Sequence, residues 1–218
     1  RVFRHWQGVE MAYFTTSDGL KLYFEDAGTG RPALCLAGLT RNARDFDFVA
    51  PHLADLRLLR LDYRGRGQSD HDPDFMSYSI LREARDVIEL LDHLDLDRVT
   101  ILGTSRGGLI AMALAAEHAN RLAGVVLNDI GPEVTATGLE RIMDYVGKPP
   151  HAATLDEAAQ ALKAVSEGQF PGVPLTRWRA QAEAMFEEQT GGGLALRYDP
   201  ELRRALVGQA GAGEGPGL

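Results

Sequence analysis

Residues 99–116, VTILGTSRGGLIAMALAA, change from a strand pattern to a helix pattern within a single turn. The apolar run Val99–Leu102 predicts a buried strand, and the Ala-rich apolar run at the end of the stretch predicts a buried helix. Gly103 and Gly107 lie two residues before and two residues after Ser105. A Cβ atom at either glycine would collide where so tight a turn brings strand and helix together. We therefore expect the Ser105 side chain to project alone from a strained turn.

Strand and helix patterns alternate on both sides of this turn. Residues 12–27 read as a hairpin with turn chemistry at Ser17-Asp18-Gly19, and residues 78–94 have the apolar spacing of a helix. Buried strands are expected near 33–37, 56–61 and 124–128. Apolar strands separated by helices are typical of a parallel sheet covered on both faces. The sequence therefore predicts an α/β fold, with a mostly parallel sheet covered by helices.

The chain changes character after Gly131-Pro132. Residues 133–207 are rich in Ala, Glu, Gln and Arg and carry no strong strand pattern. Helices are expected at 138–146, 155–167, 175–189 and 199–207. The tail, GQAGAGEGPGL, has the composition of a flexible linker. We divide the chain into a core (1–132), a helical cap (133–207) and a Gly-rich linker (208–218).

Composition excludes several classes of protein. The net charge of −8 is the reverse of the basic surface that binds nucleic acid. No apolar run approaches the roughly 18 residues of a membrane span, and the first residues show no apolar segment of a signal peptide. The single cysteine, Cys35, excludes an internal disulfide and fits a reducing compartment. We expect a cytoplasmic protein that binds neither nucleic acid nor a membrane, and predict no metal site and no cofactor.

Four stretches together resemble the α/β-hydrolase fold family. The turn around Ser105 looks like the family's nucleophile elbow, and Asp62–Asp70 is similar to its D-x-R-G-x-G-x-S-D turn after the fourth strand. Leu36–Thr40 and Asn128–Pro132 resemble the ends of its third and sixth strands. The resemblance covers residues 12 to about 132 in matching order, while the helical stretch to 207 matches only as a cap. It implies that Ser105 is the nucleophile of an acyl-transfer reaction.

The resemblance also implies roles for the neighbours of Ser105. The main-chain N–H groups of Leu39 and Arg106 would form the oxyanion hole. The Arg106 side chain either has a role toward the substrate, or it only covers the pocket floor or meets a carboxylate. Ala37 stands where the family commonly has a histidine that braces this loop. Asp129, at the end of the strand after the elbow helix, is the candidate triad acid; the alternative is a cap-hinge residue that binds nearby amides.

The histidines offer no clear general base. In this fold the base follows the acid, after the last strand, and only His151 lies C-terminal to Asp129, at the start of a cap helix. We therefore expect the catalytic histidine, with the seventh and eighth strands, to lie beyond Leu218. A chain without these strands would leave one sheet edge open, to be covered by a missing segment or by a partner or swapped chain. The other histidines are His5, His52, His71, His93 and His118.

The leading hypothesis is a serine hydrolase that cleaves a carboxylic ester or lactone through an acyl-enzyme. A serine at the nucleophile position disfavours the mechanism of haloalkane dehalogenases and epoxide hydrolases, which use aspartate. C–C bond hydrolases and cofactor-free haloperoxidases share these motifs and remain alternatives. A non-catalytic ligand-binding protein of the same fold, or an inactive fragment, is the alternative from another class. A mostly apolar small-molecule substrate is indicated by cap residues that could otherwise form the cap's own core: Ile142, Met143, Val146, Trp178, Met185 and Phe186.

Overall fold

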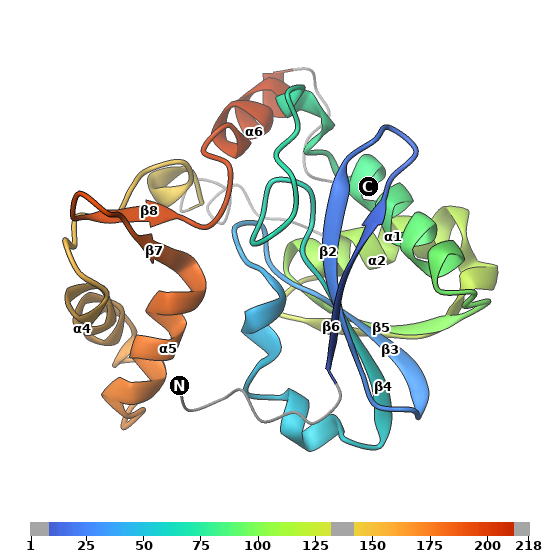
Figure 1. The fold of residues 1–218 in the computed structure, drawn as a ribbon, viewed down its shortest axis with the longest axis horizontal. Helices are drawn as coiled ribbons and strands as arrows, with labels where there is room; N and C mark the ends of the chain where they lie inside the picture. Colours follow the sequence, from blue (N-terminus) through green and yellow to red (C-terminus); the bar gives the residue numbers. More distant parts are fainter. Residues whose placement is uncertain (1–8, 132–141, 212–218) are drawn as a thin grey trace.

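The computed structural model describes residues 9–131 and 142–211, and its centre is a six-stranded mixed sheet (Figure 1). The strands are arranged in the order β1-β2-β4-β3-β5-β6. This confirms the predicted α/β class. The strands are β1 (Glu10–Thr15), β2 (Lys21–Ala27), β3 (Arg31–Leu36), β4 (Leu56–Leu61), β5 (Val99–Thr104) and β6 (Leu122–Asn128).

Strand direction follows from the connections. β1 and β2 form the predicted antiparallel hairpin, in which Gly19 adopts φ +93° at the turn. β3, β4, β5 and β6 run parallel to one another, whereas β2 pairs antiparallel with β4. In this register Leu36 lies opposite Gly103, and Gly103 lies opposite Leu127. The carboxyl ends of β3, β5 and β6 therefore meet at one edge of the sheet, as ligand sites of parallel sheets require.

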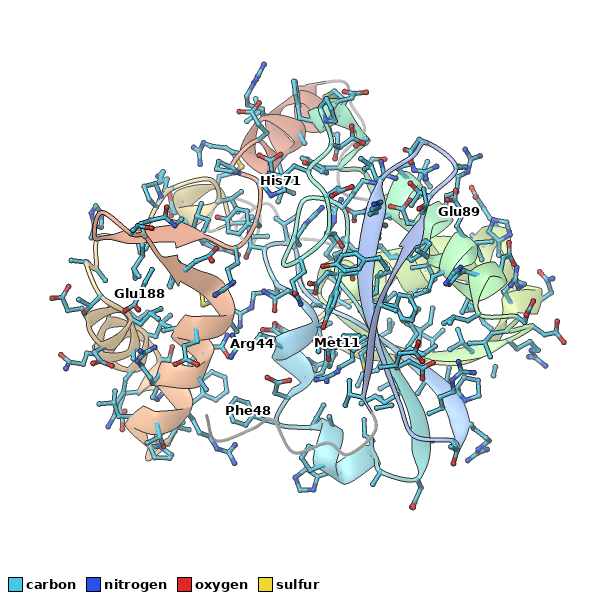
Figure 2. All side chains as sticks on the ribbon, viewed as in Figure 1. Met11, Arg44, Phe48, His71, Glu89 and Glu188 are labelled. Atoms are coloured by element: carbon cyan, nitrogen blue, oxygen red, sulfur yellow. The ribbon has the colours of Figure 1, made fainter. Side chains whose placement is uncertain are left out.

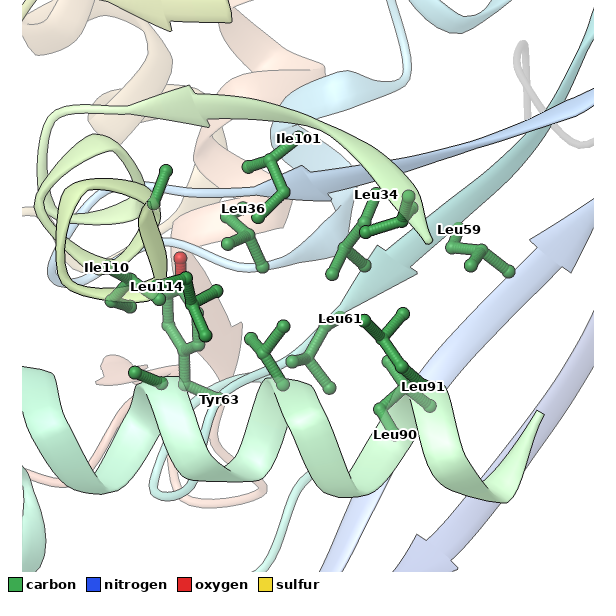
Figure 3. Packing of buried hydrophobic residues seen from close by; sticks show 14 of the residues in the cluster. Leu34, Leu36, Leu59, Leu61, Tyr63, Leu90, Leu91, Ile101, Ile110 and Leu114 are labelled. Atoms are coloured by element: carbon green, nitrogen blue, oxygen red, sulfur yellow. The ribbon is translucent and has the colours of Figure 1, made fainter. Parts of the chain in front are cut away.

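Two helices cover one face of the sheet. Leu90 and Leu91 of α1 (Ile80–His93) and Ile110 and Leu114 of α2 (Arg106–Glu117) point at the strands (Figure 3). They pack with leucines of β3 and β4, namely Leu34, Leu36, Leu59 and Leu61. All eight side chains are buried, so this layer removes a large apolar area from water and stabilises the core.

Shorter elements cover the other face. The 3-10 helices η1 (Ala43–Phe46) and η2 (Ala50–Leu53) pack Phe46 and Ala50 against Cys35. Cys35 is fully buried, and burial raises the pKa of its thiol to about 12. Both observations indicate a structural thiol.

β6 is an edge strand in the described part of the chain. It pairs with β5 on one side only. Val126 is 53% exposed, and Val125 and Leu127 are also exposed. The expected open edge, with apolar side chains uncovered, is therefore present among the residues described.

The cap differs from its predicted form. α4 (Leu155–Ser166) matches its predicted span, but α5 (Leu175–Met185) ends before 189. Residues 186–196 instead form an antiparallel hairpin of β7 (Phe186–Glu188) and β8 (Leu194–Leu196). The turn uses positive φ at Gly192 and Gly193, and it buries Phe186 and Leu194 in the cap's own core. The prediction of a cap without strands is wrong.

The last helix also departs from prediction. α6 (Leu202–Gly211) begins later than the expected 199 and continues through 208–211, which we had assigned to the linker. Tertiary packing explains the extension, because Leu202 and Ala205 are buried against Tyr78 and Gln209 Nε2 donates to the Tyr78 carbonyl at 3.1 Å. Residues 142–145 are helical, while the rest of the predicted linker (212–218) and the start of the predicted 138–146 helix lie outside the described residues. No described helix is long and apolar enough to cross a bilayer.

Main-chain bonds join the cap to the core. Gly67 N donates to Arg197 O at 2.8 Å, and Asp199 N donates to Gly65 O at 2.8 Å. At the other contact Arg44 extends from η1 toward α5 (Figure 2), and its Nη1 donates to Glu183 O at 2.9 Å. The cap is therefore attached to two segments of the core, the turn after β4 and the segment after β3.

Candidate active site

We call Gly103–Gly107 the elbow. Ser105 lies between β5 and α2 with φ +49° and ψ −112°, a conformation that is strained for a residue with a side chain. A Cβ at Gly103 would lie 2.5 Å from Gly107 O, and one at Gly107 would lie 2.1 Å from Leu36 O. Both neighbours are main-chain atoms that cannot swing aside. The glycine pattern read from the sequence is therefore a steric requirement of this turn.

The elbow lies beside the loop after β3. Gly107 N donates to Ala37 O at 3.1 Å, and the Ser105 amide donates to Asn128 O at 3.0 Å. The Leu39 and Arg106 amides, by contrast, donate no hydrogen bond within the described part of the chain. Arg106 also opens α2, where unpaired N–H groups carry partial positive charge. Two unpaired main-chain donors therefore lie on adjoining segments next to Ser105, a suitable arrangement for an anionic oxygen.

The loop Ala37–Thr40 is braced without a histidine at 37. Ala37 O accepts from Gly107 N and also from the Tyr63 hydroxyl at 3.0 Å. Leu39 O accepts from Arg66 Nε at 2.9 Å. The carbonyls on both sides of Gly38 are thus fixed by groups from the elbow and from the turn after β4. Gly107, Tyr63 and Arg66 therefore hold this loop at a place where the family commonly has a histidine.

A buried cluster of charges lies beneath the elbow. Arg106 Nε donates to Glu83 Oε2 at 2.6 Å, and Arg66 Nη1 lies 2.8 Å from Glu83 Oε1. Arg106 Nη2 also donates to Tyr78 O at 2.9 Å. Burial alone would raise the pKa of Glu83, but Arg106 and Arg66 together lower it below its ordinary value, so the carboxylate stays ionised. Of the two expectations for the Arg106 side chain, the structure supports pairing with a carboxylate.

Glu83 is a site residue that the sequence motifs did not predict. The signal was present, because Glu83 lies at helical spacing from the buried positions Val87 and Leu90 of α1. A charged residue on a buried stripe requires a partner of opposite charge. Which partner it meets depends on residues 66 and 106, and the contact forms only in the folded chain.

The turn after β4 is a hydrogen-bonded unit. Asp62 accepts from the amides of Ala43 and Gln68, at 2.7 and 2.9 Å. Ser69 Oγ donates to Asp62 O at 2.6 Å. Burial of the Asp62 carboxyl raises its pKa to about 7. Its contacts lie entirely within the core scaffold, which supports a structural role.

Asp129 follows β6 directly, next to the elbow strand. It has φ +54° and an exposed side chain. Within the described residues its carboxylate forms neither an ion pair nor a hydrogen bond. The structure therefore places Asp129 near the elbow but shows no partner that it orients. Its role as triad acid stays a prediction.

No described histidine reaches Ser105. Among residues 9–131 and 142–211, no hydrogen bond joins the Ser105 hydroxyl to a histidine or a carboxylate. His93 packs against Phe14 and Phe24. His71 is 59% exposed and lies 3.6 Å from Asp199, at the top of the view in Figure 2. His5 lies outside the described residues.

Five of the six apolar cap residues named from the sequence, all but Met143, fall into two clusters. Trp178, Met185 and Phe186 pack within the cap, in a cluster with α4, which is the alternative that we had kept open for them. Ile142 and Val146 instead pack in a cluster that contains Leu39. Only this second group adjoins the loop beside the elbow.

Residues 32–210 match the family model described as the alpha/beta hydrolase fold, and the protein belongs to this family. A crystal structure of an α/β hydrolase from Novosphingobium aromaticivorans is 42% identical, with a TM-score of 0.82, over 89% of this chain and 70% of that one.

Two curated relatives are hydrolases. The 3-hydroxybutyrate-oligomer hydrolase of Cupriavidus necator is 35% identical over 81% of this chain and 61% of that protein. Haloalkane dehalogenase 2 of Mycobacterium tuberculosis is 37% identical over 55% of this chain and 42% of that protein. The chain thus spans about two fifths to three fifths of the length of these relatives. Hydrolase relatives support enzymatic activity in general.

Proposed function

We propose that the protein is a serine hydrolase that cleaves a carboxylic ester or lactone through an acyl-enzyme formed on Ser105. The observation that carries the proposal is the strained Ser105 at the start of α2, beside the unpaired amides of Leu39 and Arg106. The hydrolase relatives support the class of reaction. The relative named for 3-hydroxybutyrate oligomers supports the bond, because hydroxy acids are joined to one another as esters.

In the proposed mechanism Ser105 Oγ attacks the ester carbonyl carbon while a general base takes its proton. The carbonyl oxygen becomes an anion, held by the Leu39 and Arg106 amides and by the positive end of α2. Collapse of this intermediate expels the alcohol and leaves the acyl group on Ser105, and water then releases the acid. Each oxyanion donor of this kind contributes about 10²–10³ in rate. We assign the base to no described residue.

Active-site labelling tests the proposal. We expect a fluorophosphonate to phosphonylate the protein, and Ser105→Ala to abolish the labelling, as located by peptide mass spectrometry. The experiment is run on the 218-residue chain and on any longer product of its gene, with p-nitrophenyl esters and lactones as substrates. A protein that is folded in every form yet neither labelled nor active would refute the proposal.

A non-catalytic ligand-binding role is the second candidate. It is favoured by the Ser105 hydroxyl, which bonds to no histidine in the described part of the chain. The two candidates separate in one experiment. Calorimetric binding of an apolar ester that stays intact, without phosphonylation of Ser105, would favour the ligand-binding protein.

A further inference from the structure

Three fully or almost fully buried ionic side chains connect the two segments that carry the unpaired amides. Arg66 and Glu83 are 0% exposed and Arg106 is 5% exposed. Glu83 lies between the two guanidinium groups, as described above. We call Arg66, Glu83 and Arg106 the buried triad.

Each end of the buried triad is fixed to one of the two segments. Arg66 Nε holds the Leu39 carbonyl at 2.9 Å, one peptide away from the Leu39 amide. Arg106 is itself the residue after Ser105, and its side chain is anchored on Glu83 and on Tyr78 O. A side-chain path from one unpaired amide to the other therefore runs through the Glu83 carboxylate, in addition to the main-chain bond from Gly107 N to Ala37 O.

Stability alone gives little reason to keep such a triad. Desolvation of buried ions offsets most of their mutual attraction, and well-packed apolar residues often serve as well or better. The guanidinium of Arg66 is also stacked between the rings of Tyr63 and Tyr78, 5.5 and 5.4 Å from their centroids. Even so, Arg66 Nη2 and Glu83 Oε1 are buried without a hydrogen-bond partner in the described residues, although Glu83 Oε1 lies 2.8 Å from Arg66 Nη1. The surroundings therefore fix the direction of Arg66 while leaving hydrogen-bonding capacity unsatisfied, which fits a role in positioning better than a role in stability.

The turn after β4, which contains Arg66, also contains Arg64, a residue suited to a control variant. Arg64 is 0% exposed and also forms buried ion pairs, with Asp86 at 2.7 Å and Asp72 at 2.7 Å. The partners of its side chain belong to α1 and to the loops before it, and within the described residues none of the side-chain hydrogen bonds of Arg64 reaches loop 37–40 or the elbow. Arg64 therefore has the burial and the charge of Arg66 without the connection to Leu39.

We infer that Glu83 and Arg66 are positioning residues, which fix the Leu39 amide relative to the Arg106 amide through the buried triad. The inference rests on the proposed function only for what the two amides bind. Because the inference concerns geometry, it is testable without turnover.

The test compares Arg66→Lys with Arg64→Lys, since lysine keeps the charge but cannot reproduce the guanidinium contacts. The Gly107 amide reports the geometry directly, because it donates to Ala37 O across the two segments. By NMR hydrogen exchange, we expect Arg66→Lys to accelerate exchange at Gly107 about fivefold or more relative to β5 core amides, the effect of weakening one hydrogen bond. Arg64→Lys should change Gly107 and the β5 amides in the same proportion.

Kinetics provide the second readout. A misplacement of about 1 Å near reacting groups costs up to about 10²-fold in rate. We therefore expect Arg66→Lys to lower kcat, or the maximal phosphonylation rate, about 10- to 100-fold with little change in KM. At temperatures at which it stays folded, Arg64→Lys should have the kcat of the wild type. Arg106→Lys keeps the main-chain amide and should behave as Arg66→Lys does. If Arg66→Lys fails to fold, Arg106→Lys is tested in its place.

The outcomes separate the two proposals. Equal exchange changes at Gly107 in the Arg66 and Arg64 variants would overturn the positioning role. In a second outcome, Arg66→Lys accelerates exchange selectively at Gly107 while the wild-type protein neither turns over esters nor reacts with fluorophosphonate. That result would uphold the positioning role and refute the proposed function. Selective exchange together with a fall in kcat alone supports both.

Discussion

Replacement of Gly107 by alanine tests the closest approach in the fold. The new Cβ would lie 2.1 Å from Leu36 O, whereas ordinary contact begins at 3.4 Å. Since the next nearest atoms are Leu36 C at 2.6 Å and Leu36 Cβ at 2.7 Å, rotation of a side chain cannot relieve the clash. Strand β3 and helix α2 must therefore separate by about 1.3 Å, as in an overpacked core.

The expected magnitude follows from two effects. Overpacking of this kind lowers the free energy of unfolding by about 1–3 kcal/mol. Separation of the segments also weakens the Gly107 N to Ala37 O bond, which adds about 1 kcal/mol. We expect Gly107→Ala to lower the free energy of unfolding by about 2–4 kcal/mol in urea denaturation. Phosphonylation of Ser105 should slow by about 10²-fold, because Ser105 and the Arg106 amide move with the helix relative to the Leu39 amide.

Gly124→Ala is the matched control. Gly124 lies in β6 of the same sheet, and its Cβ would meet only Thr100, with Cγ2 at 3.8 Å and Oγ1 at 3.9 Å, which are ordinary contacts. We expect this variant to be as stable as the wild type or up to about 1 kcal/mol more stable, because alanine restricts the unfolded chain. Equal stability and equal labelling rates in the two variants would refute the steric argument for the elbow.

Three further predictions concern ionisable groups. Because burial raises the pKa of Asp62 from 3.8 to about 7, the folded chain holds a proton there that the unfolded chain has lost. The stability advantage of wild type over Asp62→Asn should therefore fall as pH rises through this window, and a rise in urea titrations would contradict the assignment. Asp129→Asn should lower kcat if Asp129 is the triad acid; unchanged kcat in a form that turns over esters eliminates that role. Cys35 is fully buried and the pKa of its thiol is raised to about 12, so it should resist iodoacetamide until the protein unfolds. Mass spectrometry measures the labelling, and a labelled native protein would show that the β3 face is open to solvent.

Much of the fold could be predicted because its signals are short in range. Period-2 and period-3.6 apolar patterns located β5, α2 and α1. The hairpin of β7 and β8 was missed because three-residue strands carry too little pattern to compete with helical composition. The end of α6 was missed for the opposite reason, since docking on Tyr78 stabilises a glycine-rich segment that composition assigns to a linker.

The candidate site also has features that the sequence predicts and features that it does not. The elbow was readable from five residues, because the backbone there permits only glycine at positions 103 and 107. The roles of Asp129 and of the general base stay predictions, since they depend on groups that meet Ser105 in space rather than along the chain. Burial of the Arg106 side chain could not be read either, because its partner Glu83 is 23 residues away.

By itself, then, the sequence determined the alternating α/β core and the strained turn at Ser105. These follow from backbone sterics and from apolar periodicity, which act over a few neighbouring residues. Only the tertiary structure decided that Arg66, Glu83 and Arg106 form one buried triad and that Tyr63 and Arg66 brace loop 37–40 in place of a histidine. The pairing of buried charges is set by which faces pack together, and local sequence does not contain that information.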